Sequence, residues 1–497
     1  MLYNTISFIF FFIIVLLGYW VLPNKVRYIW LLLVSYYFYC VWDAKFTILL
    51  FASTIITYVC GLSIERVQRR EVDEKSKDRA KKVCVLLAVF LNLGALAYFK
   101  YTNFMVENLN LGFAKLNLGF VLPAKNIVLP LGLSFYAFQV IGYTIDVYRG
   151  DIPAERNFLK YALFVSFFPK MVSGPIERSK NLLAQIGEEH RFSFQNLKTG
   201  CLWMLWGYFL KLVIADRLGI IVNTVYGDPQ TYQGLYIVGA TVLYGIQIYC
   251  DFNGYTTIAR GCAKIMGFDL IDNFNAPYFA KNVSDFWRRW HISLTSWFRD
   301  YLYIPLGGNR KGQFRKHINV LIVFTVSGLW HGAAWGFVIW GMLNGMYQVI
   351  SGWFRPLRQR FIKEFGIDCD TLSHKILQVV GTFALIDFSW LFFRAENLNT
   401  AVAVLKNMCV FNPEILFTGG FYNLGIGKNQ FLFLMAMIVI LTLADYLKYK
   451  KINLAERILA QGAWLRIIVF ASLFWVIILL GIYGVGYDTS SFIYSNF

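Results

Sequence analysis

Long apolar segments alternate with short polar or basic loops along the whole chain. An apolar α-helix needs about 20 residues to cross the hydrocarbon core of a bilayer, so segments near this length predict membrane spans. The segments lie at residues 3–22, 28–42, 46–63, 83–101, 127–148, 197–225, 233–250, 318–331, 333–352, 376–394, 429–447 and 464–484. This pattern predicts an all-α polytopic membrane protein with about 11 transmembrane helices plus re-entrant and interfacial helices.

The basic loops predict an orientation. Residues 65–82 are dense in Lys and Arg, and such loops stay on the cytoplasmic side of a membrane. Counting back through two spans places Lys25 and Arg27 on that same side. Two separate basic loops therefore agree that the N-terminus faces outward.

Composition excludes a large soluble domain. The chain is 57% hydrophobic and 15% charged, which is more apolar than an ordinary globular domain. We expect a single membrane domain over residues 1–497, with a motif core at about 130–352 and peripheral spans at 1–126 and 375–497. The net charge of +18 falls in loops, so it indicates membrane orientation and lipid headgroups, and no nucleic-acid partner is expected.

Most familiar catalytic motifs are absent from the sequence. The eight cysteines are scattered without a C-x-x-C pair, and no zinc-type cluster, phosphate-binding G-x-x-x-x-G-K or G-x-S-x-G motif occurs. No metal and no tightly bound cofactor are expected. What remains is histidine, of which the chain has five.

His331 lies between two apolar runs, at membrane depth if these runs are embedded. An ionisable residue there is expensive and marks a functional site by default, although a histidine can also simply pack and bond a backbone carbonyl. Gly328 and Gly332 flank it, and they allow another backbone or a substrate to approach closely.

His291 follows Arg288, Arg289 and Trp290 in the aromatic and basic segment 281–316. That composition is typical of interfacial helices on the cytoplasmic face, so His291 is either a site residue or a half-solvated residue of an aromatic belt. The arginines can attract the phosphates of coenzyme A or of an acylated carrier protein, and membrane anchoring explains them equally well. We expect solvated or interfacial positions for the other three histidines, His190, His317 and His374.

The apolar run 161–168 is too short to span and ends in Pro169 and Lys170, with Gly174, Pro175 and Glu177 close behind. One interpretation is a re-entrant segment, which is tolerated at depth where protein or a water-filled cavity surrounds it. The alternative is an ordinary cytoplasmic loop with Glu177 and Arg178 as an exposed pair.

Asp251 and Asn253 come at the predicted end of the span 233–250. They can point into a cavity, but an Asp at a helix terminus is also an ordinary cap. Both interpretations stay open.

A neutral imidazole buried beside a hydroxyl can take its proton as a general base. Desolvation lowers the pKa of an imidazole and keeps the ring in the neutral form that a base needs. The residues therefore support base-assisted transfer of a group to a hydroxyl.

Four motifs in one order resemble the membrane-bound O-acyltransferase (MBOAT) family, in particular its bacterial alginate O-acetyltransferase-like branch. They are FPKMVSGPIER at 168–178, DFNGY at 251–255, FWRRWHISLTSWFRDYLYIPLGGNR at 286–310, and WHG at 330–332. With the flanking hydrophobic segments, the resemblance covers nearly the whole chain. It implies a horseshoe of helices around a central funnel, with the histidine of WHG at the constriction.

The resemblance also implies roles for residues. His331 corresponds to the principal catalytic histidine, and His291 to a second site residue that orients or polarises. The candidates for binding donor or acceptor are Trp330, Arg288, Arg289, Trp290, Lys170, Glu177, Asp251 and Asn253.

By resemblance, we expect an enzyme of the bacterial cytoplasmic (inner) membrane that moves acetyl from cytoplasmic acetyl-CoA toward hydroxyls of an exported polysaccharide. An extracytoplasmic Ser-type acyltransferase is the expected partner. One alternative is D-alanyl transfer from a carrier protein to teichoic acid, although that branch tends to have shorter chains without the segments after residue 400. A non-enzymatic transporter or flippase is a third hypothesis, and the lack of an inverted repeat argues against it.

Overall fold

The computed structural model describes residues 2–71 and 73–483. Within these ranges the protein is helical, and the only β-type pairing is an isolated antiparallel bridge between Phe274 and Trp290. The predicted fold class, an all-α polytopic membrane protein, is confirmed. The predicted end of the last span at residue 484 lies outside the described residues.

The chain forms two compact units. One contains Met1–Met204 with Ala259–Ile271, and the other contains Leu205–Ile258 with Asp272–Phe497. Helices α10 and α12 contribute residues to both units. The single domain expected over 1–497 stays a prediction.

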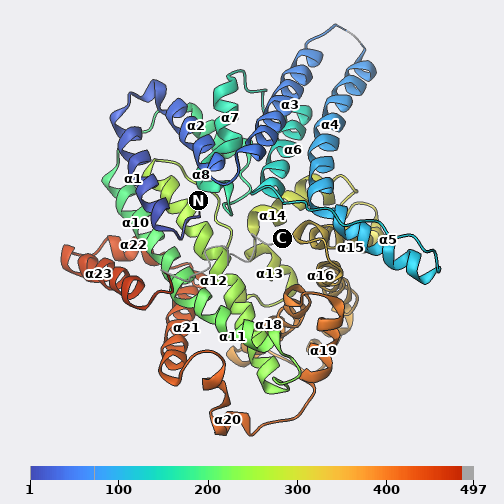
Figure 1. The fold of residues 1–497 in the computed structure, drawn as a ribbon, viewed down its shortest axis with the longest axis vertical. Helices are drawn as coiled ribbons and strands as arrows, with labels where there is room; N and C mark the ends of the chain where they lie inside the picture. Colours follow the sequence, from blue (N-terminus) through green and yellow to red (C-terminus); the bar gives the residue numbers. More distant parts are fainter. Residues whose placement is uncertain (1, 72, 484–497) are drawn as a thin grey trace. The chain divides into compact units, whose positions relative to one another are not determined.

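The first unit is built around α3, α4 and α6, which pack against one another (Figure 1). Asp43 and Asp73 begin α3 and α4 because their carboxylates accept hydrogen bonds from backbone N–H groups of the first turn. The helices of this unit are α1 (Ile6–Val21), α2 (Asn24–Cys40), α3 (Ala44–Gln68), α4 (Glu74–Leu96), η1 (Ala97–Tyr101), α5 (Thr102–Lys115), α6 (Leu133–Arg149), α7 (Phe158–Ser166), α8 (Phe168–Met171), η2 (Ser179–Leu183) and α9 (Ala184–Gly187).

The second unit contains most of the motif core. Its most extensive helix pair is α15 with α16, and α18 packs on α16. Its helices, with the two shared ones, are α10 (Phe194–Tyr208), η3 (Phe209–Ala215), α11 (Asp216–Gly227), α12 (Leu235–Ile265), η4 (Pro277–Phe279), α13 (Val283–Arg289), α14 (Ile292–Phe298), η5 (Arg299–Tyr303), α15 (Gly312–His331), α16 (Trp335–Trp353), α17 (Arg355–Glu364), α18 (Leu372–Arg394), α19 (Leu398–Met408), α20 (Ile415–Thr418), η6 (Gly420–Asn423), α21 (Lys428–Tyr449), α22 (Leu454–Leu459) and α23 (Ala463–Leu480).

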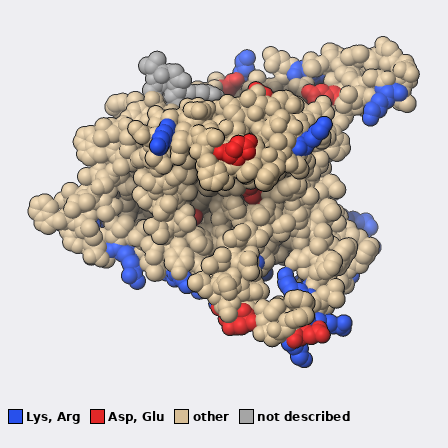
Figure 2. Space-filling view, turned by 90° about the horizontal axis from the view of Figure 1, so that it is seen from below, with Lys and Arg blue, Asp and Glu red and all other residues tan. Residues whose placement is uncertain are grey.

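Six helical segments in the described part of the chain are long and apolar enough to cross a membrane. They are Ala44–Gln68, Glu74–Lys115, Leu235–Ile265, Leu372–Arg394, Lys428–Tyr449 and Ala463–Leu480. Large apolar side chains such as Phe90, Val380 and Leu479 are exposed on them, as expected of surfaces that contact acyl chains. On the face shown in Figure 2, wide areas carry no charged side chain. The protein is therefore an integral membrane protein, and the figure of about 11 spans stays a prediction.

The predicted start of the fifth span was wrong. The span expected at 127–148 begins later, because residues 118–130 form no helix and α6 starts at Leu133. Gly132, before it, has φ +69°, and a Cβ there would lie 2.4 Å from the carbonyl oxygen of Met171. After the predicted fourth span, the chain stays helical as far as Lys115.

Candidate active site

His331 is the last residue of α15, and residues 332–334 connect it to α16. The two helices touch through their backbones, because a Cβ on Gly328 would lie 2.2 Å from the carbonyl oxygen of Phe337. Likewise, a Cβ on Gly341 would lie 2.3 Å from that of Phe324. Small residues at such a crossing are the usual way for membrane helices to pack closely. The predicted approach of another backbone at Gly328 is confirmed.

Aromatic rings enclose the imidazole of His331, which is 3% exposed. The centroid of the Trp340 ring lies 5.0 Å away at an interplanar angle of 90°. The ring of Phe393, from α18, lies 5.4 Å away at 69°, and that of Trp330 lies 4.9 Å away. This apolar enclosure keeps bulk water from the imidazole, which strengthens any polar interaction made there.

His291 lies at a sharp turn between α13 and α14, with φ +45° and ψ +52°. The left-handed region is costly for most residues other than glycine, although His tolerates it better than most. Asn273 holds the turn, because its carbonyl oxygen accepts from Ile292 N at 3.0 Å and its Oδ1 accepts from Ser293 N at 3.1 Å. The imidazole is fully buried, so the half-solvated interpretation of His291 was wrong.

The two histidines share one aromatic enclosure. Their ring centroids are 6.2 Å apart at an interplanar angle of 60°. The ring of Phe252 from α12 lies 4.7 Å from that of His291 at an interplanar angle of 77°, and the Trp330 ring lies 6.1 Å from the His291 ring. Burial lowers the pKa of His291 below its usual value, so the ring is neutral at cellular pH.

The predicted residues beside His291 have different environments. Trp290 is buried and packs on Phe286 and Trp390 at centroid distances of 5.4 and 5.1 Å. Arg289 donates to Asp285 at 3.0 Å. Arg288 is exposed. Of the two arginines, Arg288 is the one open to an external anion.

Asp251 and Asn253 lie inside α12, which continues to Ile265. The interpretation of Asp251 as a helix cap was therefore wrong. Its carboxylate is buried and forms an ion pair with Lys211 at 2.7 Å. Asn253, also buried, accepts a hydrogen bond from Thr257 Oγ1 at 3.1 Å.

Lys170 and Glu177 lie in the first unit and are 4% and 1% exposed. Lys170 donates to Gln139 Oε1 and to the carbonyl oxygen of Val165. Glu177 accepts from Ile271 N at 2.6 Å and from Asn181 Nδ2 at 2.7 Å. The alternative of an exposed cytoplasmic pair was therefore wrong for Glu177, and segment 167–177 is a buried part of the unit.

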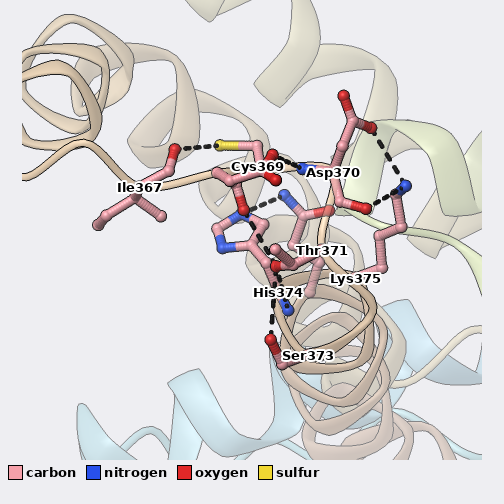
Figure 3. A network of polar contacts seen from close by, with 9 residues as sticks. Ile367, Cys369, Asp370, Thr371, Ser373, His374 and Lys375 are labelled. Carbon is pink, nitrogen blue, oxygen red and sulfur yellow. Dashed lines mark hydrogen bonds and ion pairs between the residues drawn. The ribbon is translucent and has the colours of Figure 1, made fainter.

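The other three histidines bond to local partners. His374 lies in the first turn of α18, where its backbone N–H donates to Thr371 Oγ1 and its ring bonds Gln378 (Figure 3). The ring of His317 accepts from Trp353 Nε1 at 3.0 Å. His190 Nε2 lies 2.9 Å from the carbonyl oxygen of Gln185.

Sequence reasoning missed several residues that form the enclosure. Phe252, Trp340 and Phe393 look like ordinary apolar positions of predicted spans, so no local signal marks them. Asn273 is equally unmarked in a loop. In the described residues, no group of three or more His, Cys, Asp or Glu side chains is placed to hold a metal ion.

A helical membrane protein with two enclosed imidazoles fits the class of membrane-embedded group-transfer enzymes. Comparison with known proteins is more specific: residues 152–368 match the membrane-bound O-acyltransferase family. A probable alginate O-acetylase from Pseudomonas putida is 37% identical over 413 residues, 83% of this chain and 81% of that protein. A peptidoglycan O-acetyltransferase from Helicobacter pylori is 33% identical over 444 residues, 83% and 80% of the two chains.

A more distant relative, a teichoic acid D-alanyltransferase from Bacillus subtilis, is 28% identical over 289 residues, 55% of this chain and 71% of its own. The chain belongs to the membrane-bound O-acyltransferase family, and its resemblance to the alginate O-acetyltransferase-like branch is confirmed. It is an O-acyltransferase. The hypothesis of a non-enzymatic transporter has no support.

Proposed function

We propose that the protein is an O-acetyltransferase of the bacterial cytoplasmic membrane that passes acetyl groups toward an exported polysaccharide. The donor is acetyl-CoA on the cytoplasmic side. An extracytoplasmic partner with a Ser-type acyltransfer site receives the acetyl group before the polysaccharide does. The relatives named O-acetylase or O-acetyltransferase, which match over four fifths of this chain, support this choice. The main structural support for the proposal is the pair of enclosed imidazoles, His291 and His331, whose ring centroids are 6.2 Å apart.

In the proposed reaction, the oxygen of the acceptor hydroxyl attacks the thioester carbonyl while His331 takes the proton of that hydroxyl. The C–O bond forms, the C–S bond breaks, and His331 returns the proton to the leaving thiolate, so coenzyme A leaves as a thiol. His291, neutral because it is buried, orients or polarises the reacting groups. Exclusion of water by the aromatic enclosure disfavours hydrolysis of the thioester.

The proposed orientation has the N-terminus outside. Lys25 and Arg27 in the first turn of α2, and the basic residues at the end of α3 and the start of α4, then lie in the cytoplasm. Acetyl-CoA reaches the protein from this side.

D-alanyl transfer is the second candidate. The D-alanyltransferase from Bacillus subtilis matches only 55% of this chain, whereas the acetyltransferase relatives match 83%. Coverage of the segments outside the motif core therefore favours acetyl as the transferred group.

The test is transfer of labelled acetyl from acetyl-CoA by the purified protein in nanodiscs. We compare wild type, His331→Ala and His291→Ala with His374→Ala, whose ring bonds Gln378 at the start of α18 (Figure 3). Loss of a general base costs about 10²- to 10⁴-fold in rate, so His331→Ala should lose activity by that factor. His291→Ala should lose less, and His374→Ala should match wild type.

Retention of activity by folded His331→Ala would refute the catalytic assignment. If folded wild type transferred D-alanyl from a carrier protein but no acetyl from acetyl-CoA, the second candidate would replace the first. If it transferred neither group with the polysaccharide acceptor and the extracytoplasmic partner present, the proposed donor would be wrong.

A further inference from the structure

Three buried charged side chains form a cluster in the second unit, apart from the two histidines. The Nζ of Lys211 lies 2.7 Å from Oδ1 of Asp216 and 2.7 Å from Oδ1 of Asp251. The three side chains are 0%, 7% and 2% exposed, respectively. Buried charges are expensive in any protein, and in some proteins a buried ion cluster specifies one arrangement of the elements that it joins.

The local backbone is built to bring these groups together. Lys211 lies in η3, a π-helical segment, and π-helical turns inside α-helices occur frequently at functional sites. A Cβ on Gly254 would lie 2.9 Å from the carbonyl oxygen of Gly207 and 3.2 Å from Lys211 N. Glycine at 254 therefore lets α12 approach this segment closely enough for Asp251 to reach Lys211.

Asp251 and Tyr255 form the face of α12 toward the cluster. They are four residues apart, so they lie on one side of the helix, and Lys211 Nζ lies 5.5 Å from the Tyr255 ring centroid. The ammonium thus holds this face of α12 by charge and by its position over an aromatic ring.

A different face of the same helix contacts the histidine turn. Phe252 follows Asp251 directly, which turns its side chain by about 100° around the helix axis. Its ring packs against His291 at 4.7 Å and against Phe274 at 5.1 Å. One turn earlier, Tyr249 packs on Trp290 at 6.0 Å. A rotation of α12 about its axis would therefore displace the side chains that hold His291.

We propose that Lys211 and Asp251 are positioning residues for acyl transfer, and that their ion pair fixes the rotation of α12 and thereby holds Phe252 against His291. The inference rests on the proposed role of His291. The two ion pairs join different parts of the chain. The pair with Asp251 links Lys211 to α12, whereas Asp216 is the first residue of α11, which follows the segment of Lys211 directly in the sequence.

This difference supplies a matched pair of variants, Asp251→Asn and Asp216→Asn, each of which removes one carboxylate charge at 2.7 Å from the same ammonium. We expect Asp251→Asn to lower kcat roughly 10- to 100-fold, the cost of a displacement of about 1 Å at a reacting group, with KM for acetyl-CoA little changed. The kcat and KM of Asp216→Asn should stay close to those of wild type. Asp370→Asn, which breaks the exposed pair with Lys375 drawn in Figure 3, is the surface control.

The second readout does not depend on activity. Diethyl pyrocarbonate modifies accessible imidazoles, and peptide mass spectrometry can compare His291 with the half-buried His190 as an internal reference. We expect His291 to be protected in wild type and in Asp216→Asn, and several-fold more reactive in Asp251→Asn, with thermal midpoints of the variants close together.

Equal effects of Asp251→Asn and Asp216→Asn on kcat and on His291 reactivity would overturn the proposal. So would a loss of kcat in Asp251→Asn while His291 stays protected. If instead His331→Ala were active, the proposed function would fail by itself, and the comparison of His291 reactivity would still test the role of the cluster.

Discussion

The indole Nε1 of Trp287 donates a hydrogen bond to Oδ1 of Asn344, with 3.2 Å between the two atoms. The Nδ2 of the same amide donates to the carbonyl oxygen of Trp340 at 2.9 Å and to Ser389 Oγ at 3.1 Å. One buried side chain on α16 therefore links α13, which precedes His291, to α18, which supplies Phe393 to the enclosure.

Replacement of Asn344 by Leu should destabilise the protein and lower activity together. The indole of Trp287 would lose its buried acceptor, and a buried polar group without a partner costs about 1–3 kcal/mol. The thermal midpoint in detergent and the rate of acetyl transfer are the measurements. Asn344→Asp keeps an oxygen for Trp287, but it places a buried carboxylate oxygen near the carbonyl oxygen of Trp340 and should also be less stable than wild type. A midpoint for Asn344→Leu equal to wild type would contradict the linking role.

Gly328→Ala should disrupt the packing of α15 on α16. Its new methyl group would lie 2.2 Å from the carbonyl oxygen of Phe337, a backbone atom that cannot move away without shifting α16. Overpacking of this kind costs about 1–3 kcal/mol or more, and here it also displaces His331. We expect a lower thermal midpoint and loss of acetyl transfer.

Gly381→Ala is the matched control for that substitution. Gly381 lies within α18, and no atom lies within 4 Å of a Cβ placed there. Alanine is a better helix former than glycine by about 0.5–1 kcal/mol, so this variant should be as stable as wild type or slightly more stable. If Gly328→Ala and Gly381→Ala lowered the thermal midpoint and acetyl transfer equally, the close approach of the two backbones at Gly328 would not explain the loss.

Local sequence pattern was sufficient to predict the elements that carry the histidines. The apolar runs on both sides of His331 form α15 and α16, and the flanking Gly328 does meet another backbone. Both Trp-His pairs were selected as site residues, and their imidazoles lie 6.2 Å apart. Their catalytic roles stay predictions.

Long-range partners were beyond the local pattern. Asp251, Asn253 and Gly254 have the composition of a helix end, so the span was predicted to stop at 250, yet α12 continues because Lys211 pairs with the buried carboxylate. For the same reason, the full burial of His291 was not predicted. A basic and aromatic segment indicates an interfacial helix from composition alone. The rings that cover His291, among them Phe252 and Trp330, come from distant parts of the sequence and are known only from the structure.

Stability should fall as pH decreases, in part because of His291. Its folded-state pKa is lowered by burial, whereas the unfolded chain has the usual value of about 6.5. Below pH 6.5 the unfolded state binds a proton that the folded state does not, so the contribution of His291 to the free energy of unfolding falls by up to about 1.4 kcal/mol per pH unit. Above pH 6.5 this contribution is constant. The thermal midpoint of wild type should therefore drop between pH 7.5 and 5.5.

His291→Asn is the matching variant for this pH effect, because Asn also tolerates the left-handed backbone conformation found at this position. Its midpoint should drop less than that of wild type over the same interval, and the difference between the two proteins isolates the contribution of the imidazole. An equal drop in both proteins would mean that His291 does not resist protonation in the folded state.

Of the two arginines before His291, Arg288 is the one open to the phosphates of the proposed donor, because it is exposed while Arg289 is paired with Asp285. Loss of a hydrogen bond to a charged group costs about 1.5–3 kcal/mol, so Arg288→Ala should raise KM for acetyl-CoA roughly tenfold and leave kcat nearly unchanged. Added salt should raise the wild-type KM more than that of the variant, because screening weakens exposed charge pairs. Arg360→Ala removes another exposed arginine, on α17, and should leave KM unchanged. If both variants raised KM equally, general attraction to a basic surface would replace a specific role for Arg288.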